Sequence, residues 1–271
     1  MPHETTKIVI LARGLGTRMR ADSPGTDITD AQRAAAEAGL KAMMPIDRPF
    51  LDYCLSAYAD AGYTDACLVI GPEHSAVRDY YQNLATERIT ITTAIQSEPL
   101  GTADAVLAAE TFVASDRFAM VNGDNYYPAD VMRAVRESTG NVVVGFERGT
   151  LLTESNIPAD RVRAFALLVA NQDGTLVDLV EKPDDEQYAA LAPQATISMN
   201  CFGFTPEIFQ AARSVQPSPR GELEIVDAVR TLARSHAGVA VLAIEAGVLD
   251  LSNRQDIDGV TRHLIDTRVR L

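Results

Sequence analysis

Short apolar runs alternate with amphipathic stretches through the first two-thirds of the sequence, and this alternation limits the fold more than any other feature. The runs that predict buried strands are Lys7–Ala12, Ala66–Ile70, Ile89–Ile95, Phe118–Val121 and Val142–Phe146. The stretches with helical spacing between them are Phe50–Ala61, Ser75–Leu84, Gly101–Glu110 and Ala129–Glu137. This pattern predicts an α/β fold with a mostly parallel sheet and helices on both faces. Ligands of such sheets gather at the carboxyl ends of the strands.

The pattern changes after Gly149, where shorter elements are expected. Val162–Ala170 and Leu176–Val180 predict a β-hairpin, because Asn171 to Gly174 between them is rich in turn residues. The later elements are a strand at Ile197–Phe204, helices at Glu207–Arg213 and Glu222–Ser235, a strand at Val239–Ile244 and a closing helix at Arg254–Thr267. No linker or repeat separates the two parts, so we expect one domain over residues 1–271.

The charge of the chain limits its partners. Asp and Glu number 37 against 24 Lys and Arg, which gives a formal net charge of −13. Non-specific nucleic-acid binding needs excess positive charge, so no nucleic-acid partner is expected. A phosphate ligand would have to be met locally by backbone N–H groups, a few basic side chains and metal ions.

The cysteines and the N-terminus predict a cytoplasmic protein. Cys54, Cys67 and Cys201 lie in apolar surroundings and form no CxxC pair, which is typical of reduced thiols. The segment Met1–Thr6 is short and polar and lacks the layout of a signal peptide. No apolar run approaches the ~18 residues that cross a bilayer, so no membrane partner is expected.

A glycine-rich turn follows the first expected strand, in the segment Leu11-Ala12-Arg13-Gly14-Leu15-Gly16-Thr17-Arg18-Met19. Its glycines let the backbone bend sharply, and consecutive N–H groups can form a nest for phosphate oxygens. Arg18 could add a charged fork. The turn lacks the third glycine of a dinucleotide fingerprint and the Gly-Lys-Ser/Thr of a P-loop. By itself it also fits an ordinary strand–helix connection.

The segment Arg20–Gly39 is polar and then rich in alanine. We expect a loop followed by a short surface helix. The segment is either a simple insertion or a flap over a functional site.

Further polar residues stand where chemistry could take place, and each also has an ordinary structural explanation. Lys41 precedes an apolar stretch, where solvated charges are common. Asp124 follows a strand, a position suited to a metal ligand but also typical of a turn. Glu181 and Lys182 end another strand, and Asp250 could instead cap the final helix.

Taken in order, these segments resemble the nucleoside-triphosphate sugar-1-phosphate nucleotidyltransferases, such as glucose-1-phosphate thymidylyltransferases, uridylyltransferases and mannose-1-phosphate guanylyltransferases. The resemblance runs from Ile8 to about Asp256 and begins with the family's leucine-alanine-glycine-glycine-x-glycine-threonine-arginine signature. It implies a Rossmann-like mixed sheet with a small sugar-binding lobe. The nucleotide-binding half would cover about 1–149, and the sugar-phosphate-binding half with the closing helices about 150–271. It also implies an enzyme that makes an NDP-sugar and pyrophosphate from an NTP and a sugar 1-phosphate.

The resemblance assigns roles by position. The residues matched to nucleotide binding are Leu11, Ala12, Arg13, Gly14, Gly16, Thr17, Gln96, Gly101 and Thr102. Among these, Gln96 and the Gly101 backbone match positions that read a pyrimidine, so UTP or dTTP is favoured. The residues matched to sugar-phosphate binding are Asn125, Glu181, Lys182 and Asn200. The catalytic set would be Arg18, Lys41, Asp124, Lys182 and Asp250, with Asp124 and Asp250 as ligands of a Mg²⁺ cofactor. The resemblance leaves open whether the protein forms a homo-oligomer.

The implied reaction is an in-line attack of a sugar 1-phosphate oxygen on the α-phosphorus of the triphosphate. The nucleophile is already an anion, so no general base is required. The histidines, His3, His74, His236 and His263, all fall in surface-like segments. Rate enhancement is expected from positioning and charge neutralisation.

Several positions depart from the family pattern. Arg13 stands where the family has glycine; it could contact phosphate, turn outward or damage the site, and the first two are preferred. Leu40 replaces a common proline, and Phe165-Ala166 replaces tyrosine-glycine. The segment Val248 to Asn253 corresponds to the family's last metal-binding motif. It keeps the aspartate of that motif as Asp250, but the neighbouring residues differ from the family's.

Three alternatives remain. One is the same reaction with GTP or CTP, or with a heptose, aminosugar or cyclitol phosphate. Another is a catalytically silent regulatory protein that binds nucleotide sugars. Its support is Arg13 and the altered segment 248–253. The third, a glycosyltransferase of similar topology, would carry an Asp-x-Asp motif where this chain has Asp124-Asn125-Tyr126.

Overall fold

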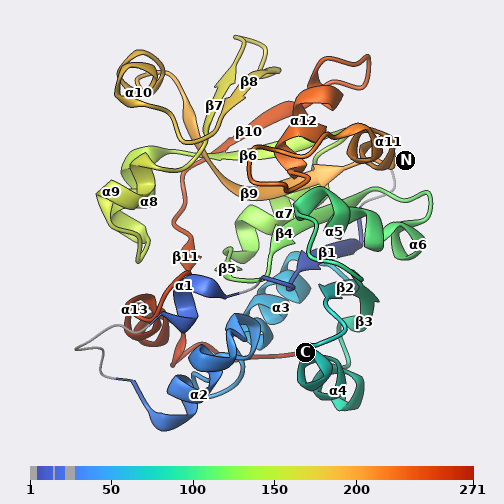
Figure 1. Ribbon diagram of the computed structural model, residues 1–271, viewed down its shortest axis with the longest axis vertical. Coiled ribbons are helices and arrows are strands. Elements are labelled where there is room, and N and C mark those ends of the chain that lie inside the picture. The colour runs from blue at the N-terminus through green and yellow to red at the C-terminus, as the bar shows by residue number, and fades with distance from the viewer. Residues whose placement is uncertain (1–4, 15, 22–27) are drawn as a thin grey trace.

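The computed structural model describes residues 5–14, 16–21 and 28–271. Expectations for residues 1–4, for Leu15 in the glycine-rich turn and for the loop at 22–27 therefore lie outside the described residues. The chain folds around a mixed sheet whose main path runs β10-β6-β9-β4-β1-β2-β3 (Figure 1). These strands are β1 (Lys7–Leu11), β2 (Asp65–Ile70), β3 (Thr90–Ile95), β4 (Phe118–Asn122), β6 (Val142–Phe146), β9 (Thr196–Phe204) and β10 (Ala240–Ile244).

The first half of the chain forms the parallel part of the sheet. β1 pairs in parallel with β2 on one side and β4 on the other, and β3 extends the sheet beyond β2. In this register Leu11 lies opposite both Val69 and Asn122, so the three strands end together. These strands are apolar along most of their length because helices cover both sides of the sheet. The predicted α/β fold with a mixed, mostly parallel sheet is confirmed.

Alternate residues of β1 belong to different cores. Ile8 and Ile10 pack with α3 (Phe50–Ala61) and α7 (Ala129–Glu137) on one face. Val9 packs on the other face, against a layer formed by α5 (Thr102–Ala108), α11 (Glu207–Ser214) and α12 (Ile225–Ala233). Successive side chains of a strand point to opposite faces, which is why one short apolar run serves two cores. Within the described ranges, no helix is long and apolar enough to span a bilayer.

The second half adds the antiparallel part and one further parallel strand, β10, which pairs with β6. β9 lies between β4 and β6 and runs antiparallel to both. The hairpin of β7 (Leu167–Ala170) and β8 (Leu176–Val180) joins the sheet through β7 and β9. Figure 1 shows this hairpin and α10 (Asp185–Leu191) at one end of the molecule, with α2 (Asp30–Ala38) and α4 (Ser75–Asn83) at the other. The remaining helices of this half, α8 (Arg148–Glu154) and α9 (Ala159–Arg163), follow β6.

Several predicted boundaries were wrong. The strand expected over Val162–Ala170 begins only at Leu167, because α9 takes its first residues. Pro158 precedes this helix and Asp160 lies in its first turn, and both favour a helix start. The helix expected from Glu222 begins at Ile225. The helix expected over Gly101–Glu110 is divided into α5 and α6 (Glu110–Val113), and the closing helix α13 spans only Asp256–Leu264.

The surface helix expected within Arg20–Gly39 is confirmed as α2. Thr29 and Gln32 form a reciprocal capping box that satisfies backbone N–H groups at its start. The Gln32 side chain also donates to the Pro45 carbonyl at 3.0 Å, which ties α2 to the chain beyond it. The short helices α1 (Thr17–Arg20) and η1 (Lys41–Met43) flank this segment.

Two glycines allow the turn after β1 to pack against the end of α2. Gly16 has φ of +62°, a left-handed conformation that favours glycine. A Cβ on Gly16 would lie 2.6 Å from the Cα of Gly39, which is itself the left-handed C-cap of α2. The close approach brings the glycine-rich turn and the start of η1 together.

We expect Gly16→Ala to lower the free energy of unfolding by about 1–3 kcal/mol, because the new Cβ adds backbone strain and a clash with Gly39. Gly14→Ala is the matched control, since a Cβ there meets nothing within 4 Å. Urea unfolding at pH 7 measures both. Equal stability of the two variants would contradict the packing described above.

Candidate functional site

Two cavities adjoin at the carboxyl ends of β1 and β4. Both are lined by Gly14, Lys41, Asn122, Asp124 and Glu222. We call them the base-side cavity and the sugar-side cavity, after the roles that the family resemblance implies for the residues that line them. The predicted site residues divide between them, with Glu181 and Lys182 as the exceptions. Those that line the base-side cavity are Leu11, Ala12, Arg13, Gln96, Gly101 and Thr102, and those that line the sugar-side cavity are Gly16, Thr17, Arg18, Asn125, Asn200 and Asp250.

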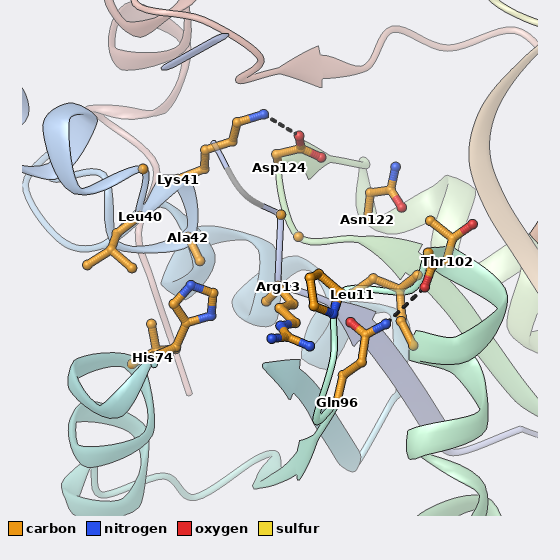
Figure 2. A pocket seen from close by; sticks show the side chains of 18 of the residues that line it. Leu11, Arg13, Leu40, Lys41, Ala42, His74, Gln96, Thr102, Asn122 and Asp124 are labelled. Atoms are coloured by element: carbon orange, nitrogen blue, oxygen red, sulfur yellow. Dashed lines mark hydrogen bonds and ion pairs between the residues drawn. The ribbon is translucent and has the colours of Figure 1, made fainter. Parts of the chain in front are cut away.

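Gln96 is a fixed hydrogen-bond acceptor in the base-side cavity (Figure 2). It follows β3 and is 4% exposed. Its Nε2 donates to the Gly101 carbonyl at 3.0 Å and to Asp104 Oδ2 at 2.9 Å. Because both partners are acceptors, the amide nitrogen must face them, and Oε1 is left to accept a hydrogen bond from a ligand.

The segment after Leu100 is hydrogen-bonded to Leu223 and Ile225. Leu223 accepts a backbone hydrogen bond from Ala103 at 2.8 Å and donates one to Leu100 at 2.7 Å. The Thr102 hydroxyl accepts from the Ile225 N–H at 2.8 Å. Gly101 is required here, because its φ is +120° and a Cβ would lie 2.5 Å from the Leu223 carbonyl oxygen.

This pairing brings Glu222 to the boundary of both cavities, a position that the sequence did not predict. Glu222 was expected to begin a helix, but that helix starts three residues later at Ile225. Gly221, with φ of +78°, forms a turn directly before Glu222. The available sequence signal was this glycine, which precedes Glu222 and lies four residues before the helix start.

Lys41 and Asp124 meet where the cavities join. Lys41 begins η1, and Asp124 follows β4. The Lys41 Nζ lies 2.9 Å from Asp124 Oδ2, and the two side chains are 18% and 26% exposed. Figure 2 shows this ion pair on the side of the cavity opposite Gln96. Arg18, on α1, is exposed and lines the sugar-side cavity, so it adds positive charge to the same region.

Asp250 is placed beside Asp124 by a short strand pair. β11 (Leu249–Asp250) runs antiparallel to β5 (Asn125–Tyr126), with Asp250 opposite Asn125. Leu251 N–H donates to the Asp124 carbonyl at 2.9 Å and continues this pairing. Asp250 therefore does not cap the final helix, whose N-cap is Gln255.

The Asp250 carboxylate is buried among polar partners. Asn125 and Ser252 donate to its Oδ1 at 3.0 and 3.1 Å, and Arg161 on α9 forms an ion pair with its Oδ2. Burial raises the pKa of Asp250 to about 6, and the negative charge of Asp124 acts in the same direction, while Arg161 opposes it. Arg161 also binds Asp256 at 2.7 Å. No sequence signal marked Arg161, because a strand was expected over the following residues.

Asn200 reaches the sugar-side cavity from an irregular point of β9. The register between β6 and β9 shifts between Val143 and Gly145, so that extra β9 residues form a bulge. Asn200 lies in this bulge with φ of +58°, a conformation that is costly for a residue other than glycine. Tyr127 donates a hydrogen bond to the Met199 carbonyl and supports the bulge from the core.

Glu181 and Lys182 are the predicted site residues that line neither of the two cavities. They follow β8. Lys182 has φ of +44°, so its backbone is also strained. Their assignment to sugar-phosphate binding stays a prediction.

Asp124 and Asp250 suit a divalent cation. The two carboxylates lie close enough for the charge of one to raise the pKa of the other, as expected where a cation would relieve repulsion. Mg²⁺ is usually bound by one or two carboxylates together with substrate phosphates, and does not need a complete protein cage. No group of three or more His, Cys, Asp or Glu side chains suited to a metal occurs in the part of the chain that the structure describes.

Comparison with known proteins decides the family. The pattern of the family described as nucleotidyl transferase matches residues 7–257. The chain belongs to this family. The predicted family and the predicted transferase class are therefore confirmed.

Named relatives of this nucleotidyl transferase cover most of the chain. A glucose-1-phosphate thymidylyltransferase from Streptomyces antibioticus is 33% identical over 264 residues, which is 96% of this chain and 66% of that protein. A UTP–glucose-1-phosphate uridylyltransferase from Haloferax volcanii is 28% identical, over 94% of this chain and 95% of that protein. The chain thus spans about two-thirds of the first relative's length and nearly all of the second's.

A solved structure shows the same fold. A crystal structure of UDP-glucose pyrophosphorylase complexed with UDP-glucose matches with a TM-score of 0.74 at 20% sequence identity. The match covers 97% of the nucleotidyl transferase chain and all of the other chain. The arrangement of strands described above is therefore common to both.

We expect Arg161→Gln to lower the free energy of unfolding by about 1–3 kcal/mol, because two buried carboxylates lose their cation. The matched control is Arg262→Gln, which removes an exposed ion pair with Asp258 on α13 and should cost about 0.5 kcal/mol or less. Urea unfolding of the nucleotidyl transferase at pH 7 measures both. A loss for Arg161→Gln no larger than that of the control would contradict the role given to this ion pair.

Proposed function

We propose that this protein transfers a nucleotidyl group from an NTP to a sugar 1-phosphate, releasing pyrophosphate and forming an NDP-sugar. The observation that carries the proposal is the pair of adjoining cavities that share Lys41 and Asp124. One cavity has an acceptor suited to a base, and the other is lined by carboxylate, amide and hydroxyl groups suited to a sugar phosphate. The reacting phosphates would then lie where the cavities meet.

In the proposed reaction a phosphate oxygen of the sugar 1-phosphate attacks the α-phosphorus. A new P–O bond forms, the bond between the α-phosphorus and the bridging oxygen breaks, and pyrophosphate leaves with the electron pair. The attacking oxygen is already anionic, so proton removal is not needed. His74 is the one imidazole that lines either cavity among the described residues, and burial lowers its pKa below the usual 6.5. We assign His74 no part in proton transfer.

Charge neutralisation is assigned to residues at the junction of the cavities. Arg18 and Lys41 are placed to attract the triphosphate, and N–H groups of the glycine-rich turn to bind its oxygens. Asp124 and Asp250 would hold Mg²⁺, which when bound neutralises phosphate charge. Mg²⁺ as the cofactor is part of the proposal.

Sugar recognition is assigned to two asparagine side chains and to the two charged residues that follow β8. Asn125 and Asn200 line the sugar-side cavity and present groups that can bind hydroxyls. Glu181 and Lys182 keep their assigned role in sugar-phosphate binding through the family resemblance alone. Phe165, which also lines this cavity, would shape its apolar side.

The proposed nucleotide is UTP or dTTP. Gln96 Oε1 can accept the ring N–H that uracil and thymine carry, and the named relatives are a thymidylyltransferase and a uridylyltransferase. We also propose that the protein works in the cytoplasm, since its three cysteines are unpaired and buried.

Pyrophosphate release from a panel of UTP, dTTP, CTP and GTP, each with glucose 1-phosphate and other sugar 1-phosphates, tests the proposal. We expect the highest rate with UTP or dTTP, loss of turnover in excess EDTA and recovery with Mg²⁺. No turnover across the panel, combined with binding of a UDP-sugar, would instead indicate a regulatory protein. Turnover that persists in EDTA would refute the proposed metal.

We expect Asp124→Asn to lower kcat at least about 100-fold, because it removes a carboxylate that would hold Mg²⁺ at the reacting phosphates. Its melting temperature should stay close to that of the wild type, because the side chain is partly exposed. Asp130→Asn on the exposed surface of α7 is the control and should keep full activity. An unchanged kcat for Asp124→Asn would remove this residue from the catalytic set.

A further inference from the structure

Arg13 points toward the base end of the site. Its backbone belongs to the glycine-rich turn, but Figure 2 shows its guanidinium beside Gln96, on the side away from the Lys41–Asp124 pair. The Arg13 side chain is only 8% exposed although it lines the base-side cavity. The position therefore separates Arg13 from Arg18, which lines the sugar-side cavity.

Three hydrogen bonds hold the Arg13 guanidinium in place. Arg13 Nε donates to Glu73 Oε1 at 3.2 Å, and Nη2 to Glu73 Oε2 at 3.4 Å and to the Ser97 carbonyl at 3.4 Å. Glu73 can reach this place because Gly71 has no side chain: a Cβ there would lie 2.2 Å from Glu73 Oε1. The carboxylate and carbonyl thus occupy one edge of the fork and fix its direction.

The other edge of the fork has no partner. Arg13 Nη1 is shielded from solvent and donates to no acceptor among the residues that the structure describes. A buried charged donor without an acceptor is unfavourable. The atom belongs to a residue that lines the cavity, so a ligand can supply the missing acceptor.

A phosphate is the wrong acceptor for this donor. The charge of Arg13 is already balanced by Glu73, and a phosphate bound there would meet the Glu73 carboxylate at close range. A neutral carbonyl oxygen accepts the same hydrogen bond without that repulsion.

The adjacent acceptor on Gln96 narrows the choice of base. On the C4 side of the ring, uracil and thymine present a carbonyl next to the N3–H, whereas cytosine presents an amino group next to an unprotonated N3; the C2 carbonyl on the other side is common to all three. A pocket with a donor from Arg13 and an acceptor from Gln96 therefore matches the first pair and opposes cytosine at both positions.

We propose that Arg13 selects the base: its Nη1 donates to the C4 carbonyl oxygen beside the N3–H that Gln96 accepts, and so favours uracil or thymine over cytosine. The proposal rests on the proposed function, since it takes the base-side cavity as the nucleotide site. It gives Arg13 a role in specificity and none in holding the triphosphate.

The test is calorimetric binding of UMP and CMP, without triphosphate or sugar phosphate. Wild-type protein is expected to prefer UMP. Arg13→Ala should weaken UMP roughly ten- to hundredfold, because a charged hydrogen bond to the base is lost, and should leave CMP within about twofold. Arg18→Ala is the matched control and should weaken the two nucleotides equally.

Two further variants keep the test decisive if Arg13→Ala does not fold. Arg13→Lys retains the charge but not the fork, and Glu73→Gln retains Arg13 but loosens its anchor; both should reduce the preference for UMP. Equal weakening of UMP and CMP in the Arg13 variants, or an unchanged preference, overturns the proposal.

Binding and turnover separate this inference from the proposed function. Wild-type protein that prefers UMP through Arg13 but releases no pyrophosphate from any triphosphate supports the base selection and refutes the activity. Normal pyrophosphate release by an Arg13 variant that still prefers UMP supports the activity and refutes the base selection. A wild type that binds neither nucleotide overturns both.

Discussion

The parallel pairing of β1 with β2 and β4 is the constraint on which the site depends. It ends three strands at one edge, with Leu11 opposite both Val69 and Asn122. The turns that follow these strands must then share one small space. That is why Arg13 after β1 meets Glu73 after β2, and why Asp124 after β4 lies within reach of Lys41. Gly14, Asn122 and Asp124, which line both cavities, end or follow strands of this shared edge.

The basic side chains at this edge contrast with the negative net charge of the whole chain. The protein carries a net charge of −13, yet the predicted phosphate region is lined by Arg18 and Lys41. Two of the acidic groups there are paired: Lys41 pairs with Asp124, and Arg161 with Asp250. Local pairing lets an acidic protein present a site suited to an anionic ligand.

Strained backbone marks the same region. Gly16 and Gly101 adopt positive φ where a side chain would meet neighbouring backbone, and Asn200 does so in a bulge of β9. The first two positions are glycines that sequence reasoning could single out. Asn200 was found through the family resemblance, and its strain appears only when β6 and β9 pair out of step.

The sequence alone determined the α/β class, most of the strands and helices, and the order of the motifs, because apolar periodicity and turn residues are local properties. Through the family resemblance it also singled out many of the residues that line the two cavities, but not others such as Asn122, Glu222 and Ser252. Only the tertiary structure decided that Arg13 pairs with Glu73 beside Gln96, that Arg161 pairs with Asp250, and that Glu181 and Lys182 lie outside both cavities. Each of these depends on contacts between residues far apart in the chain, and no local pattern encodes where such a side chain points.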